Sequence, residues 1–306
     1  MLPHYSMTHA RTVQLISNPN AGRGGRQRAA EVARFCALLA ARGVAVEVLN
    51  TTAPHDATRL AREAASAGAR EIVVAGGDGT INEALQGLVG TGVRLGVWPA
   101  GTANVLAREL GLPFDLRGVV EVIARGQTRR IYTGCATDEQ TGARRYFCLM
   151  AGIGLDASIV AQVRTPLKRR VGKGAFWVAG LSLLARWRPA SFNVEVGGET
   201  YTATFAAIGK TAHYGGGFAV TPRARLDKAE FELCLVSFYG RLRYLRLLAH
   251  TKRPQGVTRP LDRVRFIRAT QVRASGDAPV QVDGELIGRL PMTFEIVPEP
   301  IEVLAP

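Results

Sequence analysis

The first 130 residues alternate between short apolar runs and stretches with helical periodicity. Apolar runs of strand length occur at residues 12–17, 44–50, 71–76 and 95–99. Apolar side chains recur at helical spacing in the intervening segments 26–42, 56–67 and 81–88, and a further helix is expected from about Asn104. Strands that alternate with helices predict a parallel sheet covered on both faces.

The pattern changes after about Gln127, where short β-rich segments with alternating polarity dominate. Helical patterns interrupt them near 156–186 and 240–250. We therefore expect two domains, which suits a chain of 306 residues. The first is an α/β domain over residues 1–130. The second is an antiparallel β-sandwich over 131–306. As an alternative, the last ten or so residues of the chain could return to the first domain.

Composition places the chain among globular proteins, with 47% hydrophobic and 21% charged residues. Its most apolar stretch, residues 175–185, is shorter than the roughly 20 residues that a membrane-spanning helix needs. The first 15 residues lack the apolar segment of a secretory signal. Four scattered cysteines without a C-x-x-C pair predict neither a zinc site nor a disulfide framework. These features predict a soluble, cytoplasmic protein.

The net charge of +14 suits an anionic partner, with an arginine bias from genome composition, or solvated and paired arginines, as the alternatives. Ten basic residues and a single acid lie between Arg241 and Arg273, and five basic residues lie between Arg164 and Lys173. Such segments suit phosphate on a nucleotide, a nucleic acid or an anionic membrane. We find no helix-turn-helix, RNA-binding aromatic motif or zinc finger, so a nucleic-acid partner is not expected.

Three loops join a predicted strand to a predicted helix, at the sheet edge where ligands of parallel α/β sheets bind. They are Asn18-Pro19-Asn20-Ala21-Gly22, Gly76-Gly77-Asp78-Gly79-Thr80 and Pro99-Ala100-Gly101-Thr102-Ala103-Asn104. Their glycines permit positive φ angles and close approach of backbone N–H groups to phosphate. Asp78 can hold Mg²⁺, and Thr80 adds a hydroxyl donor. The alternatives are an ordinary turn for the first loop, a turn with an Asp cap for the second, and a helix cap from Thr102 or Asn104 for the third.

Together with three later segments, these loops resemble the diacylglycerol kinase catalytic-domain family of lipid kinases. The later segments are GIGLDA (152–157), YGGGFAVTPRA (214–224) and VDGE (282–285). The family includes bacterial diacylglycerol and YegS-type lipid kinases, with sphingosine and ceramide kinases as relatives. GGDGT alone would also fit NAD kinases and phosphofructokinase relatives, whereas PAGTAN followed by Ala107-Arg108, together with the late DGE, is more specific.

The resemblance implies a nucleotide-binding α/β domain of the phosphofructokinase and NAD kinase type, a C-terminal antiparallel β-sandwich, and ATP in the cleft between them. Carried over residue by residue, the ATP contacts would be Asn18, Pro19, Asn20, Ala21, Gly22, Thr51, Gly76, Gly77, Asp78, Gly79, Thr80, Ile81, Asn82 and Thr102. Asp78 would hold the Mg²⁺ that accompanies ATP.

The late DGE motif is implied to supply the general base, either Asp283 or Glu285. From the residues alone, this segment reads as a hairpin turn. Asp156 is expected near the lipid headgroup or in a water-linked network to the metal, or alternatively as the N-cap of a helix.

One departure from the family pattern concerns a second metal ion. Family members often carry a DDG-like turn that binds a structural Mg²⁺, but here Lys228 and Ala229 follow Asp227 in place of the second Asp and the Gly. A charged lysine offers no lone pair to a metal. The resemblance therefore does not extend to a complete second site, although Asp227 could retain part of it.

These observations predict an ATP-dependent lipid kinase that phosphorylates a lipid hydroxyl, with diacylglycerol converted to phosphatidic acid as the default reaction. A sphingoid or ceramide lipid kinase, and an NAD-kinase-like or other small-molecule kinase, are the alternatives. A non-catalytic nucleotide-binding regulator is a rival from another class. Because the substrate stays in a bilayer, we expect peripheral contact with the anionic inner face of the membrane. The sequence leaves the lipid and the oligomeric state open.

Overall fold

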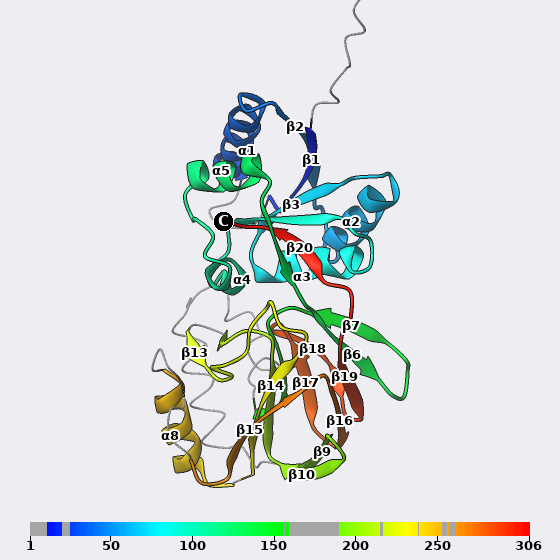
Figure 1. The fold of residues 1–306 in the computed structure, drawn as a ribbon, viewed down its shortest axis with the longest axis vertical. Coiled ribbons are helices and arrows are strands. Elements are labelled where there is room, and N and C mark those ends of the chain that lie inside the picture. Colours follow the sequence, from blue (N-terminus) through cyan, green and yellow to red (C-terminus); the bar gives the residue numbers. More distant parts are fainter. Residues whose placement is uncertain are drawn as a thin grey trace, which may run out of the picture. The chain divides into compact units, whose positions relative to one another are not determined.

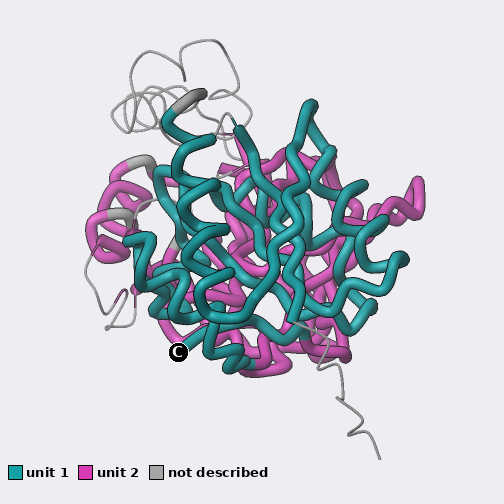
Figure 2. Tube along the Cα trace, turned by 90° about the horizontal axis from the view of Figure 1, so that it is seen from above, with its two compact units in different colours: residues 1–129, 301–306 teal, residues 130–300 magenta. Residues whose placement is uncertain are grey.

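The computed structural model describes residues 11–19, 25–155, 157–158, 190–214, 217–237, 239–252, 256 and 261–306. Within it the chain divides into two compact units, residues 1–129 with 301–306 and residues 130–300 (Figure 2). Several expectations lie outside the described residues: Asn20, Ala21, Gly22, Asp156, most of the helical pattern over 156–186, and the basic run 164–173.

The first unit is built on a six-stranded sheet with the strand order β2-β1-β3-β4-β20-β5. Its strands are β1 (Arg11–Ser17), β2 (Val44–Asn50), β3 (Glu71–Gly76), β4 (Arg94–Pro99), β5 (Thr128–Ile131) and β20 (Ile301–Leu304). The pairs β1–β2, β1–β3, β3–β4 and β4–β20 are all parallel. All six residues of β3 are buried, as in a central strand covered on both faces. The predicted parallel α/β sheet is thus confirmed.

Helices cover this sheet on both sides (Figure 1). They are α1 (Gly25–Ala40), α2 (Asp56–Ser66), α3 (Asp78–Leu88), α4 (Val105–Glu109) and α5 (Leu116–Arg125). Helices α1 and α5 share a core with alternate residues of the central strands, in which Phe35 stacks on Trp98 with ring centroids 4.6 Å apart. Helices α2 and α3 pack together and contact β1 and β3.

The second unit is a sandwich of two six-stranded sheets, with the orders β10-β9-β16-β19-β6-β7 and β15-β14-β11-β8-β17-β18. The first sheet contains β6 (Gly134–Asp138), β7 (Arg144–Phe147), β9 (Phe192–Val196), β10 (Glu199–Ala203), β16 (Gln271–Gly276) and β19 (Met292–Ile296). The second contains β8 (Met150–Gly154), β11 (Phe205–Gly209), β14 (Phe231–Val236), β15 (Val264–Ala269), β17 (Pro279–Val282) and β18 (Glu285–Arg289).

Neighbouring strands of the sandwich are antiparallel, and both sheets contribute to one core. In that core Phe147 stacks on Phe231 with ring centroids 5.7 Å apart. The predicted antiparallel sandwich is therefore confirmed. A small hairpin of β12 (His213–Tyr214) and β13 (Phe218–Ala219) and a helix, α8 (Arg241–Thr251), are attached to it. None of the helices in the described part of the chain combines the length and apolarity that crossing a bilayer requires.

Candidate active site

The loops that follow β1, β2 and β3 meet at the carboxyl edge of the parallel sheet. The backbone N–H of Thr51 donates to the carbonyl of Ser17 at 3.0 Å, and that of Asn18 donates to the carbonyl of Ala75 at 3.2 Å. The side-chain amide of Asn18 donates to Oγ1 of Thr80 at 3.3 Å. The structure thus brings three expected ATP-contacting residues together. Pro19 follows Asn18 and is half-buried.

The loops after β3 and β4 approach each other so closely that only glycine fits. A Cβ atom on Gly101 would lie 2.5 Å from Cα of Gly77, and one on Gly77 would lie 3.1 Å from Cα of Gly101. A Cβ on Gly76 would meet the side chain of Thr80 at 2.6 Å. None of Gly76, Gly77 and Gly79 adopts a positive φ. The positive φ angles that glycine permits are therefore not used here, and Gly76 and Gly77 serve close packing.

Gly79 differs from its neighbours because space is open around it. A Cβ atom there would meet nothing within 4 Å. Helix α3 begins at Asp78, three residues before the predicted start, so Gly79 and Thr80 lie in its first turn. The first N–H groups of a helix have no intrahelical acceptor and, with the helix dipole, favour an anion. An open, glycine-bearing first turn is a suitable place for phosphate.

Asp78 connects the second loop to the third. Its Oδ1 accepts a hydrogen bond from the backbone N–H of Leu106, in the first turn of α4, at 3.3 Å. Asn104 precedes α4 but does not cap it with its side chain, which instead bonds the backbone N–H and carbonyl of Gly101, each at 2.9 Å. Thr102 is exposed. The carboxylate expected to hold a metal therefore also fixes the helix beside the exposed Thr102.

Two further expected contacts, Ile81 and Asn82, are buried in the first unit. Ile81 is 1% exposed, and its N–H already donates to the carbonyl of Gly77 at 3.1 Å. Asn82 is 3% exposed, and its Oδ1 accepts from the side-chain amide of Gln86 at 3.2 Å. Both side chains thus support α3 from within the protein.

The DGE motif forms a two-residue hairpin turn between β17 and β18. Asp283 and Gly284 have φ angles of 46° and 84°, the positive values that a type I′ turn requires. The Asp283 carboxylate accepts backbone N–H bonds from Cys148, Leu149 and Met150, each at 2.9 Å. This aspartate therefore ties the turn to the segment between β7 and β8.

Glu285 is placed differently from Asp283. Its side chain is 32% exposed and is paired with the guanidinium of Arg145. Its carboxylate thus reaches solvent, whereas that of Asp283 is surrounded by three backbone donors. In the structure the Asp283 carboxylate binds backbone N–H groups, whereas the Glu285 carboxylate is accessible. The sequence left this distinction open.

The carboxylate of Asp227, which could retain part of a second metal site, lies in an ion pair. The Asp227 carboxylate is paired with the Arg225 guanidinium at 2.9 and 3.1 Å, and this hydrogen bonding lowers the pKa of Asp227. Backbone carbonyls of the same turn bind the ammonium of Lys210. In the described residues, no three His, Cys, Asp or Glu side chains gather as a metal site.

Comparison with known proteins identifies both units. Residues 12–136 match the model of the diacylglycerol kinase catalytic domain, and residues 150–305 match that of the YegS C-terminal NAD kinase beta sandwich-like domain. The chain belongs to the diacylglycerol kinase catalytic-domain family. It is an ATP-dependent lipid kinase, as its motifs predict.

Similar lipid kinases align along nearly the whole chain. A diacylglycerol kinase of Mycobacterium tuberculosis is 33% identical over 302 residues, covering 96% of this chain and 95% of the relative. A diacylglycerol kinase of Staphylococcus aureus is 29% identical, with 96% and 92% covered. A crystal structure of a diacylglycerol kinase from Bacillus anthracis has the same fold, with a TM-score of 0.78, 22% identity and 98% of each chain covered.

One feature of this lipid kinase that the sequence pattern did not reveal is a buried arginine beside the third loop. Arg28 of α1 is 4% exposed, and its guanidinium lies 4.3 Å from the ring centroid of Trp98. It lines a pocket of about 530 Å³ with residues of α1, Trp98, Pro99 and the start of α5. In the part of the chain that the structure describes, its Nε and Nη2 have no hydrogen-bond partner. A guanidinium therefore lines the pocket beside the third loop.

Proposed function

We propose that this kinase phosphorylates the free hydroxyl of diacylglycerol, with ATP as donor and phosphatidic acid as product. The observation that carries the proposal is that three loops meet in the first unit, through the Asn18–Thr80 hydrogen bond and the close approach of Gly77 and Gly101. The second unit supplies an accessible carboxylate, that of Glu285. The relatives named diacylglycerol kinase support this choice of lipid.

The first unit would hold ATP through its loops. Asn18, Pro19, Asn20, Ala21 and Gly22, with Thr51, Thr102 and the run from Gly76 to Thr80, are the proposed contacts. The buried Ile81 and Asn82 would support α3 from within the protein. The open space at Gly79 and the first turn of α3 fit phosphate oxygens. Asp78 would hold Mg²⁺, because this ion is bound through one or two carboxylates together with substrate phosphates. When bound, the ion neutralises charge on the transferring phosphoryl group.

Glu285 is the proposed general base. Its carboxylate is accessible, so it can come within hydrogen-bond reach of a lipid hydroxyl. It would take the proton as the new O–P bond forms and the bond from the γ-phosphorus to the bridging oxygen breaks, with ADP as the leaving group. Arg145, its ion-pair partner, orients it. Asp283 acts as a positioning residue that fixes the turn before Glu285. Asp156 remains a proposed residue near the lipid headgroup.

A lipid panel tests the proposal. Incubated with labelled ATP and either detergent-dispersed lipids or NAD, the protein is expected to label diacylglycerol at least tenfold faster than ceramide or a sphingoid base, and to leave NAD unlabelled. Labelling of a sphingoid lipid in preference to diacylglycerol would contradict the choice of lipid. Labelling of NAD alone would contradict the proposal as a whole. Each assay is run with and without Mg²⁺, since the metal-free reaction is expected to be inactive.

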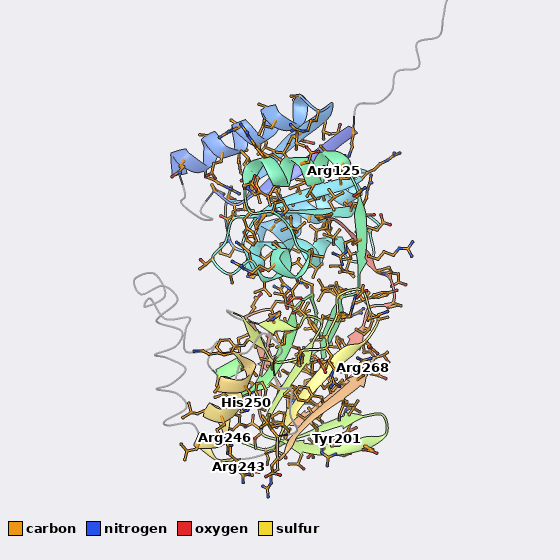
Figure 3. All side chains as sticks on the ribbon, turned by 60° about the vertical axis from the view of Figure 1, so that its left-hand side comes forward. Arg125, Tyr201, Arg243, Arg246, His250 and Arg268 are labelled. Carbon is orange, nitrogen blue, oxygen red and sulfur yellow. The ribbon has the colours of Figure 1, made fainter. Side chains whose placement is uncertain are left out.

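We further propose that the enzyme reaches its lipid by peripheral contact with an anionic membrane, through helix α8. Tyr244 and Leu247 are buried and anchor this helix to the sandwich. On its outer side Leu242 is 77% and Leu245 is 39% exposed. Arg243 and Arg246 flank them and are labelled in Figure 3. Exposed leucines between arginines suit the interface of an anionic bilayer.

The rest of the basic segment contributes less than its composition suggested. Arg268 pairs with Glu230 at 3.2 Å, and Arg273 pairs with Glu139 and Glu195 at 2.9 and 2.8 Å. Arg243 has an exposed partner, Asp262, at 3.5 Å. Ion pairs thus neutralise Arg268 and Arg273 outside α8. The exposed leucines of α8 make this helix the part of the segment that favours a membrane.

Vesicle co-sedimentation tests the role of α8. Binding is expected to rise with the phosphatidylglycerol content of phosphatidylcholine vesicles and to fall with salt. Arg246→Ser should weaken it about fivefold, corresponding to about 1 kcal/mol per basic residue, and Leu242→Ser about tenfold or more. Arg125→Ser and Val48→Ser, exposed positions of the first unit, are the matched controls and should bind like the unmodified protein. Variants of α8 that bind like these controls would overturn the docking surface, and activity on detergent-dispersed lipid separates that outcome from failure of the kinase.

A further inference from the structure

Lys210 is a fully buried lysine whose ammonium lies inside a turn of backbone carbonyls. It follows β11 directly and is 0% exposed. Its Nζ donates to the carbonyl oxygens of Arg225 at 3.2 Å and Glu230 at 3.0 Å, and also to that of Lys228. An ammonium has three hydrogens, so these three acceptors satisfy it completely.

The three acceptors come from a single stretch of six residues before β14. Backbone carbonyls that converge on one point form the kind of ligand set that hard cations occupy in proteins. The carboxylate of Asp227 is paired with Arg225 and does not bind the ammonium. Burial lowers the pKa of Lys210 to about 8, while the charges of Asp227 and Glu230 raise it.

We propose that Lys210 is the built-in cation of this turn, in place of the second divalent ion that the family resemblance implied. The covalently attached ammonium occupies three carbonyls of the turn, and Lys228 and Ala229 stand where the family pattern has the second Asp and the Gly. The turn is therefore formed without a metal ion, and its stability does not depend on metal concentration.

The same lysine is connected to the DGE hairpin through one residue, Leu149. The backbone N–H of Lys210 donates to the carbonyl of Leu149 at 2.8 Å, and Thr211 donates to it through its N–H at 3.2 Å. The N–H of Leu149 donates to the Asp283 carboxylate at 2.9 Å. Lys210 is thus a positioning residue for the segment that holds Asp283, and this part of the inference rests on the proposed role of the hairpin.

Metal removal tests the proposal on the unmodified protein. Without nucleotide, EDTA is expected to leave the thermal unfolding midpoint unchanged, and added Mg²⁺ or Ca²⁺ should not raise it. A midpoint that falls in EDTA and recovers with Mg²⁺, with both effects lost in Asp227→Asn, would show a divalent ion in the turn and overturn the proposal. This measurement needs neither lipid nor activity.

Chemical rescue tests the ammonium itself. Lys210→Ala removes the ammonium from all three carbonyls, of which that of Arg225 keeps a bond from the N–H of Lys228 at 3.3 Å, and is expected to lower the midpoint by roughly 5 °C or more. Propylammonium supplies the three carbons and the charged nitrogen that the substitution removes, so millimolar amounts should restore the midpoint, whereas propanol should not. Lys228→Ala removes an exposed lysine in the same turn and is the matched control, with neither loss nor rescue expected. Equal rescue by propanol would show that the lysine only fills space, and would overturn the proposal.

The positioning role is tested by kinetics in the same samples. Lys210→Ala is expected to lower turnover roughly tenfold or more at an unchanged KM for ATP, because the hairpin and not the nucleotide site is displaced. Propylammonium should restore turnover in parallel with the midpoint. Restored stability without restored turnover would overturn the connection to Asp283. If Lys210→Ala does not fold, Lys210→Met keeps the apolar stem and is measured in its place, with the same loss expected.

Discussion

Glu285→Gln is expected to lower turnover by roughly 10²–10⁴-fold, the usual contribution of a general base. Glutamine keeps the length and shape of the side chain but cannot take a proton from the lipid hydroxyl. Its amide also no longer carries the charge that pairs with Arg145, and because Glu285 is partly exposed this loss costs little stability. The measurement is kcat with detergent-dispersed diacylglycerol, alongside ATP affinity by calorimetry, which should not change.

The matched control is Asp283→Asn, two positions earlier in the same hairpin. Here an amide would face the backbone N–H groups of residues 148–150 and lose bonds to a charged acceptor, so the free energy of unfolding should fall by about 1.5–3 kcal/mol. Urea unfolding should therefore distinguish the two variants, with Glu285→Gln close to the unmodified protein. Near-normal turnover in a folded Glu285→Gln protein would remove this residue from the mechanism.

The division of labour in the hairpin illustrates what the sequence could not provide. Alternating apolar runs were enough to predict the sandwich and to place a turn at Asp283 and Gly284. The partners of Asp283 lie at residues 148–150, more than 130 positions away along the chain. No local pattern encodes that contact, so the roles of Asp283 and Glu285 stayed undivided until the fold brought the segments together. Lys210 stayed unnoticed for the same reason.

The first unit was more accessible to sequence reasoning because its signals are local. Strands, helices and the three loops follow from periodicity within short windows. The errors arose where two loops meet. Gly77 leaves room for the close approach of Gly101. Asp78 accepts a hydrogen bond from the N–H of Leu106 in α4, the helix that follows the third loop. Helix α5 was not predicted, although Asp115 caps it and Val119, Val120 and Ile123 have helical spacing.

Gly79→Asp is expected to weaken ATP binding by roughly a thousandfold. The new carboxylate would project into open space at the first turn of α3, where the phosphates are proposed to bind. Two like charges about 4 Å apart repel by about 4 kcal/mol at the effective dielectric of a protein surface, and every 1.4 kcal/mol corresponds to about tenfold in affinity. The fold should survive, because a Cβ at this position meets nothing and an acidic side chain in the first helical turn is favourable.

Gly79→Asn separates the charge from the size of the new side chain. Asparagine has nearly the same volume without the charge, so its ATP affinity should lie much closer to that of the unmodified protein if repulsion dominates. Calorimetry with ATP measures both variants, and thermal unfolding verifies that they are folded. A stronger deficit for Gly79→Asp at low salt than at high salt would follow from screening of the same repulsion. Unchanged ATP affinity in a folded Gly79→Asp protein would show that the phosphates bind elsewhere, because a Cβ atom at this position meets nothing within 4 Å.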